Sequence, residues 1–350
     1  MKKPTINDVA EKARVSKATV SAVINNRDTV KLSTKERVLS VIEDLKFQPR
    51  GHRRIKEPAE STIGLIIREL DNPFYSAIAT GVKKYANSKA YSLFIASSER
   101  LHHNEEIISR QFVAKGIRGA IIAPVINGDT EIDHLFRLKK LNYPFVLLEE
   151  VSGILANVVS IDNEKAVKEA VKYLIECGHS HIVHFSGPKY ASHTYERISG
   201  FQNAFSESRL IYDEELIIPC GSHFQDGYQA GLTYFKSFPA DRFPIAVVCY
   251  NDMVAFGLMS ALKKLSIKVP NQVSIIGNDD VEFARHWSPP LTTISAPLSE
   301  LGKKAAEILI RNIETETTPP PEMHVLEAKL AIRDTVFDLK RETKPQGIHH

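Results

Sequence analysis

The chain has 350 residues, a net charge of +3 and 43% hydrophobic residues, which suits two or three globular domains. It contains no run of 18 apolar residues, and it begins with polar and basic residues, so we expect neither a membrane span nor a signal peptide. Its three cysteines have no paired spacing, which argues against a disulfide framework and fits a reducing cytoplasm.

Positive charge is concentrated near the N-terminus. Residues 1–56 hold 14 Lys and Arg against 6 Asp and Glu, a net of +8, which leaves −5 for residues 57–350 because the whole chain carries +3. Basic charge gathered on one small module is the electrostatic footprint of nucleic-acid binding. The alternative is a small helical bundle that binds another protein, and the charge argues against it.

Three stripes of apolar residues at helical spacing predict three short helices in residues 5–48. A tight turn at residues 13–15 separates the first two, and Ser16 takes the N-cap position of the second, expected over 17–25. This arrangement is typical of a helix-turn-helix DNA reader. The stripes are Ile6, Val9, Ala10 and Ala13; Val15, Val20, Val23 and Ile24; and Val38, Val41, Ile42 and Leu45.

The second helix presents its polar face to DNA in this motif, because its apolar residues face the small core. A lysine there reaches a guanine edge or a phosphate, a serine reaches either kind of group, and an alanine methyl contacts a thymine methyl. The residues of this module that we expect to contact DNA are Thr5, Ser16, Lys17, Ala18, Thr19, Ser21, Ala22 and Asn25.

Residues 49–61 are a basic hinge or linker, punctuated by proline and glycine. An apolar wedge at Ile55, or arginines that read a narrow minor groove, would bring this stretch onto DNA. A tether that only touches phosphates is the alternative. The linker residues that we expect to contact DNA are Arg50, Arg53, Arg54, Ile55 and Lys56.

From Thr62 onward, apolar strands and amphipathic helices alternate, which predicts parallel sheets with helices on both faces. The predicted fold is an all-α helix-turn-helix headpiece (residues 1–48) followed, after the linker, by an α/β core of two doubly wound lobes (62–340). The N-lobe covers about 62–161 plus 295–322, and the C-lobe about 162–292 plus 323–337. In this scheme 291–295 returns toward the N-lobe, helices run over 195–207 and 226–238, and the last strand covers 325–332.

Several motifs carry a family resemblance. The pattern T-I-N-D-V-A-x-x-A-x-V-S-x-x-T-V-S-x-V-I-N (5–25) resembles the opening of the lactose-repressor (LacI/GalR) family of bacterial transcription regulators, and D-N-P-F-Y (71–75) and C-Y-N-D-M-V-A-F-G (249–257) extend the likeness into the core. The resemblance implies a core built like the periplasmic sugar-binding proteins. The chain departs from the family pattern at Arg14 (usually Gly), Ala22 (usually Arg), Lys56 (usually Leu) and Asn278 (usually Phe or Tyr).

Ligands of open parallel sheets bind beyond the carboxyl ends of the strands, which places a site between the two lobes. The resemblance implies that Tyr75, Arg197, Asn251 and Asp279 contact the effector. A fork of donors, a bidentate acceptor and a stacking ring suit sugars, and they also suit purines. The residues that we expect to bind the ligand are Asn72, Phe74, Tyr75, Glu149, His193, Arg197, Phe224, Asn251 and Asp279.

Each of these assignments has a structural alternative. Arg197 would pair with Glu196 or Glu207 on a helix surface, a pairing of small net value. Asp279 would cap a turn, Asn251 and Asp252 would cap the following helix, and Tyr75 would only pack.

We expect a ligand-responsive repressor that binds two-fold operator DNA as a homodimer, and we expect neither a cofactor nor a bound metal. The histidine-rich H-S-H-I-V-H (179–184) lacks a further ligand, and no phosphate-binding glycine motif occurs. The rivals are a solute-binding protein and an enzyme on a doubly wound fold. The tail after Asp338 lacks leucine heptads, which argues against a coiled-coil tetramer.

Overall fold

The computed structural model describes residues 4–24, 30–45, 61–125, 132–189, 191–315 and 319–340. The chain forms two compact units, Met1–Pro58 and Ala59–His350. The predicted fold class is confirmed: helices of a reader come first, and a two-sheet α/β core follows. Among the described residues, no helix is both long enough and apolar enough to cross a membrane.

The described residues of the first unit form three helices, α1 (Ile6–Lys12), α2 (Lys17–Ile24) and α3 (Leu32–Asp44). Its core consists of the apolar residues that the helical spacing identifies, including the fully buried Val9, Val20 and Val38. All three helices contribute to this cluster, and a short helix gains most of its stability from such packing.

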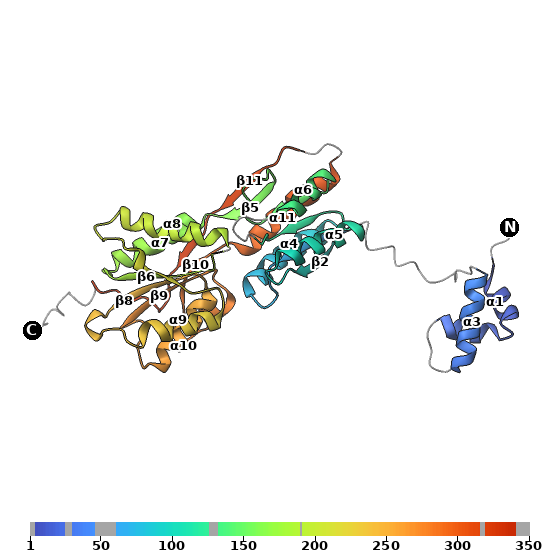
Figure 1. Cartoon of the computed structure of the whole chain (residues 1–350), viewed down its shortest axis with the longest axis horizontal. Helices are drawn as coiled ribbons and strands as arrows, with labels where there is room; N and C mark the ends of the chain where they lie inside the picture. The colour runs from blue at the N-terminus through green and yellow to red at the C-terminus, as the bar shows by residue number, and fades with distance from the viewer. Residues whose placement is uncertain are drawn as a thin grey trace, which may run out of the picture. The chain divides into compact units, whose positions relative to one another are not determined.

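The N-lobe sheet has the strand order β11-β5-β4-β3-β1-β2, and all its pairings are parallel. Helices α4 (Pro73–Ser88) and α11 (Leu298–Glu314) lie side by side on one face, and α5 (His102–Ala114) and α6 (Asp133–Lys140) cover the other (Figure 1). The strands are β1 (Thr62–Ile67), β2 (Ser92–Ser97), β3 (Ala120–Ile122), β4 (Phe145–Leu147), β5 (Asn157–Ile161) and β11 (Met323–Leu326).

Because helices cover both faces, β1 is buried at every position, which explains its continuous apolar run. The close packing of α4 against α11 depends on small residues. A Cβ placed on Gly302 would lie 2.1 Å from the carbonyl oxygen of Ile78, so any side chain there would push the two helices apart.

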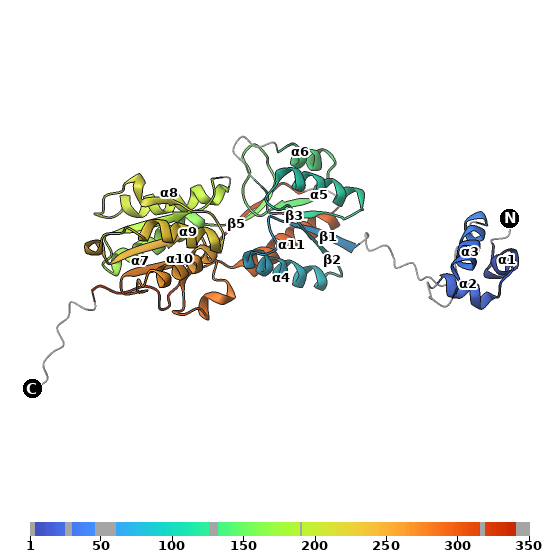
Figure 2. The same ribbon diagram turned by 60° about the horizontal axis from the view of Figure 1, so that its bottom comes forward.

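The C-lobe sheet has the order β12-β10-β9-β8-β6-β7, and only β12 runs antiparallel to its neighbour. Helices α9 (Phe224–Phe235) and α10 (Asp252–Lys264) pack together on one face, and α7 (Asn163–Glu176) and α8 (Ser192–Ser206) on the other (Figure 2). The strands are β6 (Ile182–Ser186), β7 (Ile217–Pro219), β8 (Ile245–Cys249), β9 (Val273–Asn278), β10 (Thr292–Ser295) and β12 (Lys329–Ala331).

The chain crosses between the lobes after β5, after β10 and after β11. Two predictions about these crossings are wrong. Residues 292–295 pair with β9 in the C-lobe, so the return to the N-lobe follows Ser295. The single strand expected over 325–332 is two strands, and β11, which the sequence assigns to the C-lobe, pairs with β5 of the N-lobe. Only Glu327 and Ala328 separate the two strands, and neither residue signals a break.

Two helices of the C-lobe begin earlier than expected. Helix α8 begins at Ser192 instead of residue 195, and α9 begins at Phe224 instead of residue 226. His193 therefore lies in the first turn of a helix, and His223 becomes the N-cap residue of α9. These starts place His193 in the lining of the cavities described below and His223 beside them.

Candidate DNA-reading surface and ligand cleft

The turn between α1 and α2 is built as the sequence predicts. The hydroxyl of Ser16 accepts a hydrogen bond of 3.1 Å from the backbone N–H of Thr19, so Ser16 caps α2. Lys17 and Ala18 are exposed, whereas Thr19, Ser21 and Ala22 are half-buried. The exposed start of α2 thus combines a cation with small side chains.

Arg14 has a left-handed backbone, with a φ of +52°. Such a conformation is costly for a residue with a Cβ and is adopted freely by glycine. The family pattern has Gly at this position, so the arginine keeps the turn at the cost of some backbone strain.

Thr5 begins α1 and forms a reciprocal cap with Asp8. Its backbone N–H and its hydroxyl both donate to Asp8 Oδ2, at 2.6 and 2.8 Å. Thr5 therefore caps helix α1, a structural role in addition to the predicted contact with DNA. The other predicted DNA contacts lie outside the described residues: Asn25, Arg50, Arg53, Arg54, Ile55 and Lys56.

Between the described parts of the core, two adjacent cavities of about 50 Å³ each lie at the carboxyl ends of the strands. We call them the first and the second compartment. Besides the residues that both compartments share, the first is lined by Asn72, Arg100, Ser222, Tyr250 and Asn251. The second is lined by Glu149, Ser160, Asn163, Glu196 and Asn278. Residues of both lobes line each compartment. The residues common to both are Arg68, Phe74, Tyr75, His193, Arg197 and Asp279.

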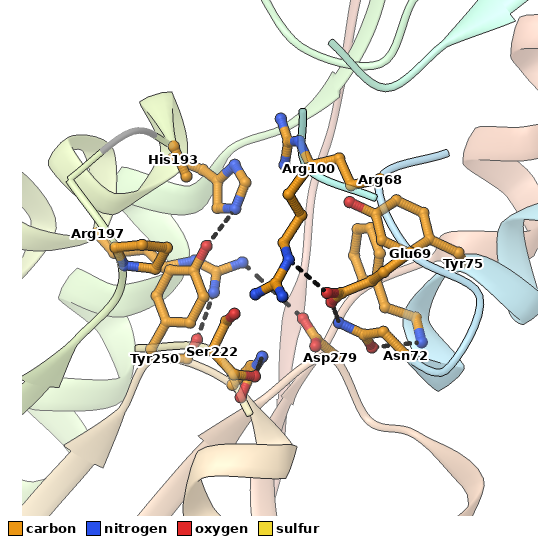
Figure 3. A pocket seen from close by; sticks show the side chains of 14 residues that line it. Arg68, Glu69, Asn72, Tyr75, Arg100, His193, Arg197, Ser222, Tyr250 and Asp279 are labelled. Carbon is orange, nitrogen blue, oxygen red and sulfur yellow. Dashed lines mark hydrogen bonds and ion pairs between the residues drawn. The ribbon is translucent and has the colours of Figure 1, made fainter. Parts of the chain in front are cut away.

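Arg197 lies between the compartments and is 5% exposed. Its Nε donates to Asn163 Oδ1 at 3.1 Å, and its Nη1 donates to the backbone carbonyl of Tyr250. Its guanidinium carbon lies 4.6 Å from the centre of the Tyr250 ring, within the range of a cation–π contact (Figure 3). The alternative pairing of Arg197 with Glu196 or Glu207 is not what the structure shows.

Asp279 faces Arg197, with Oδ1 3.9 Å from Nη2. Burial raises the pKa of Asp279 to about 7, and the charge of Arg197 opposes that rise. The backbone at Asp279 has a φ of +121°, a strained value that neighbouring contacts hold in place, including the Asp280–Arg333 ion pair at 2.6 Å. Strain held in this way is often found where a side chain is aimed into a functional site.

The carboxylate of Glu149 joins the two lobes. It forms an ion pair with Arg68 of its own lobe and accepts a hydrogen bond from the hydroxyl of Ser192 of the C-lobe. His193 Nδ1 lies 3.4 Å from the same carboxylate, and the Tyr250 hydroxyl lies 2.5 Å from His193 Nε2. Burial lowers the pKa of His193 well below its usual value, so the ring is neutral, accepts from Tyr250 and donates toward Glu149.

A second bridge between the lobes lies beside the first compartment. His223 Nε2 of the C-lobe lies 2.9 Å from Glu69 Oε2 of the N-lobe, and His223 Nδ1 lies 3.2 Å from Asp226 Oδ2. Arg100 also approaches Glu69, at 3.5 Å (Figure 3). The Glu149 and Glu69 bridges thus join the lobes at the cleft through side chains, in addition to the crossings of the chain itself.

Two predicted ligand residues are also helix caps. Asn72 Oδ1 accepts from the N–H of Phe74 at 3.0 Å, and Asn251 Oδ1 accepts from the N–H of Val254 at 2.9 Å. The capping alternative is therefore right for Asn251, although the residue lines the first compartment too. Asp252 is not the cap, because its carboxylate accepts from Val281 N–H and the Thr293 hydroxyl.

The remaining residues predicted to bind the ligand differ in whether they line the cavities. Phe74 and Tyr75 line both compartments, and their rings meet edge to face at 5.1 Å. Phe224 lines neither compartment; it packs against the C-lobe core instead. Its prediction assumed that it preceded its helix, whereas it is the first residue of α9.

Sequence reasoning missed Arg68, Glu69, Arg100, Ser222 and Tyr250 as lining residues. For three of these residues, the sequence does contain a signal, namely their position directly after a strand. Arg68 and Glu69 directly follow β1, and Tyr250 directly follows β8, so the rule on strand ends applied to them as well. Arg100 and Ser222 lie farther along their loops, and nothing in their local sequence indicates the cleft.

Comparison with known proteins gives matches along the chain. Residues 5–50 match the family model described as bacterial regulatory proteins, lacI family, and residues 171–336 match a periplasmic binding protein-like domain. An HTH-type transcriptional repressor PurR of Vibrio cholerae is 33% identical over 343 residues, covering 96% of this chain and 99% of the relative. The repressor of the same name from Photobacterium profundum is 32% identical with the same coverage.

Solved structures agree with these matches. A complex of the transcriptional regulator CelR with cellobiose is 27% identical, with a TM-score of 0.71 over 95% of this chain and 99% of the other. A LacI family regulator from Enterococcus faecium with bound ribose is 25% identical, with a TM-score of 0.69 over 80% of this chain and 100% of the other. The chain therefore belongs to the lacI family of bacterial regulatory proteins and is a ligand-responsive, DNA-binding repressor.

Proposed function

We propose that this repressor responds to a sugar or sugar derivative bound between the two lobes of its core, and that binding there changes its affinity for operator DNA. The observation that carries the proposal is the pairing of Arg197 with Asp279 where the compartments meet. A guanidinium and a carboxylate together donate to and accept from neighbouring hydroxyl groups, and the nearby Tyr75 offers a ring for the apolar face of a sugar.

Entry of a ligand is coupled to the arrangement of the lobes. Each compartment holds only a few water molecules, since one water needs roughly 10–15 Å³. A sugar ring therefore enters only when the lobes part or their bridging side chains move. The Glu149 and Glu69 bridges are the contacts that must rearrange, and a ligand that prefers one arrangement shifts the population toward it.

The exposure of Lys17 and Ala18 at the start of α2 supports their place on the reading face, which in the proposal also includes the half-buried Ser21 and Ala22. The basic linker residues Arg50, Arg53, Arg54, Ile55 and Lys56 extend this contact in the proposal, because their charge suits phosphates and the minor groove. Residues 1–48, 49–61 and 62–340 then serve as reader, hinge and ligand-binding core. Such a protein acts where the bacterial chromosome lies, in the cytoplasm.

We further propose a homodimer that matches a two-fold operator. The N-lobe sheet ends in the edge strand β2, where Phe94 and Ile95 are exposed. Leu70, which follows the neighbouring strand β1, and Leu101, which follows β2, are more than half exposed. An exposed edge strand that carries large apolar side chains is a surface that another chain covers in stable proteins.

A thermal-shift screen of sugars, sugar acids, sugar phosphates and nucleosides tests the effector class. A ligand that binds only the folded state raises the melting temperature by mass action. We expect a sugar to stabilise the wild type and to have no effect on Arg197→Ala. Stabilisation by nucleosides alone would contradict the sugar assignment.

A purine or nucleoside is the second candidate, and one observation favours it. Two tyrosines, Tyr75 and Tyr250, line the first compartment, and planar bases stack on such rings. The same screen distinguishes the two classes, because it contains both.

A further inference from the structure

The second compartment is lined by both apolar and polar side chains. Its N-lobe side combines the apolar side chains of Ile78, Leu148 and Leu301 with the polar groups of Arg68, Glu149 and Ser160. Its C-lobe side carries the polar groups of Asn163, Glu196 and Asn278. A pyranose ring presents both kinds of group, with carbon-bound hydrogens on a face and hydroxyl groups around the rim.

Asn278 is the unusual residue of this compartment. It is 3% exposed, and its side-chain Nδ2 has no hydrogen-bond acceptor among the described residues. A buried donor without an acceptor destabilises a folded protein, and each such group in a native structure calls for an explanation. The family pattern has Phe or Tyr here, so this donor is a feature of the present chain.

Glu196 supplies the complementary group. Its carboxylate accepts from Asn163 Nδ2 at 2.8 Å, and Asn163 is in turn held by Arg197 Nε at 3.1 Å. An amide donor and a carboxylate acceptor in one compartment match a hydroxyl group, which accepts from the first and donates to the second. The first compartment has its own polar set in Asn72, Ser222 and Asn251.

We propose that the effector has two linked sugar rings, one in each compartment, and that Asn278 Nδ2 selects the second ring by donating to one of its oxygens. The inference rests on the proposed function and adds to it a ligand class, a disaccharide, and a specificity residue. Arg197, Asp279 and Tyr75, which line both compartments, contact the ligand near the linkage between its rings.

The test is isothermal titration of the full chain with disaccharides (cellobiose, maltose, lactose, sucrose, trehalose) and with single rings (glucose, galactose, fructose, ribose). We expect one disaccharide to bind at least tenfold tighter than any single ring. Asn278→Leu, which keeps the size and removes the amide, weakens that disaccharide about tenfold and changes single-ring affinity less than twofold. Ser222→Ala, which alters only the first compartment, weakens both kinds of probe by the same factor.

Asn278→Asp is the control for a folding defect, because it keeps the shape of the side chain and replaces only the hydrogen-bond donor by an acceptor. Circular dichroism and operator binding verify that each variant folds, and we expect Asn278→Asp to lose affinity for the disaccharide as Asn278→Leu does. A single ring that binds as tightly as every disaccharide, or an Asn278→Leu variant that retains full disaccharide affinity, would overturn the inference alone. Absence of binding by every sugar would overturn the proposed effector class and the inference with it.

Discussion

The guanidinium of Arg197 lies over the ring of Tyr250, 4.6 Å from its centre, and donates to the carbonyl of the same residue. Tyr250 thereby fixes the arginine from two directions. Its ring attracts the cation, and its backbone oxygen holds Nη1, so that Nη2 is turned toward Asp279. The orientation of the cation that we propose to bind the ligand thus depends on Tyr250, the residue that directly follows β8.

The first prediction concerns this contact. Tyr250→Leu keeps the carbonyl and removes the ring, so Arg197 loses a cation–π contact worth about 1–2 kcal/mol in a desolvated site. We expect effector affinity to fall roughly tenfold by isothermal titration. The matched control is Tyr228→Leu, because Lys264 lies 5.7 Å from the centre of that ring outside both compartments. Equal losses in the two variants would show that the effect is not local to the cleft.

The second prediction concerns pH. The pKa of Asp279 is raised by burial to about 7, so below pH 7 the group is largely protonated and is a poor acceptor for a ligand hydroxyl. We expect effector affinity to rise with pH and to level off above 7, with binding about tenfold weaker at pH 6 than on the plateau. Asp279→Asn should bind weakly at every pH, and a pH-independent wild type would contradict this account.

The same pKa shift affects stability. Between about pH 4 and pH 7, folded Asp279 keeps a proton that the unfolded chain has released. The contribution of this group to the free energy of unfolding is therefore present at low pH and is lost as pH rises through 7. Urea unfolding of the wild type and Asp279→Asn across this range should diverge, and parallel curves would show that the carboxyl is not perturbed.

The third prediction concerns the reader. Arg14→Gly relieves a backbone held at φ +52° and should stabilise the helix-turn-helix unit by roughly 0.5–1 kcal/mol. Hydrogen exchange of the α1 and α2 amides measures this in the full chain. Arg14→Ala is the control, because alanine keeps a Cβ and the strain remains. Slower exchange in both variants would mean that the arginine charge is the cause, not the backbone.

The fourth prediction concerns DNA. Lys17→Ala should lower operator affinity about tenfold and reduce the salt dependence of binding by about one ion, as expected for a lost phosphate contact. Fluorescence anisotropy at several salt concentrations measures both quantities. Lys303→Ala is the charge-matched control, since Lys303 is exposed on α11 of the core. An unchanged salt slope with relaxed sequence preference would indicate that Lys17 contacts a base edge instead.

The alternation of strands and helices was readable from the sequence because parallel strands covered on both faces are continuous apolar runs, as in β1. The end of the core was not readable in this way. Residues 325–332 contain no turn signal, yet the chain changes sheets there, because sheet pairing depends on partners distant in sequence. Local pattern predicts that a strand exists but does not predict its neighbours.

The cleft was predictable where a chemically distinctive side chain directly follows a strand, as with Asp279, and where the family resemblance implies a contact, as with Arg197 of helix α8. It was not predictable where a loop folds back. Arg100 lines the first compartment because of the path of its loop. Phe224 does not line it, because α9 begins two residues earlier than expected. The bridge from Glu69 to His223 spans 154 residues, and no local pattern indicates it.

The most direct test of the account measures operator affinity with and without the effector. Operator sites selected from random DNA and the sugar found by the thermal-shift screen are used with the full-length wild type and with Arg197→Ala. We predict that the sugar changes the operator Kd of the wild type at least tenfold, a coupling of about 1.4 kcal/mol. Arg197→Ala should bind the operator equally well and show no change with the sugar. A full response in Arg197→Ala, or a wild-type operator Kd that the bound sugar leaves unchanged, would contradict control through the cleft.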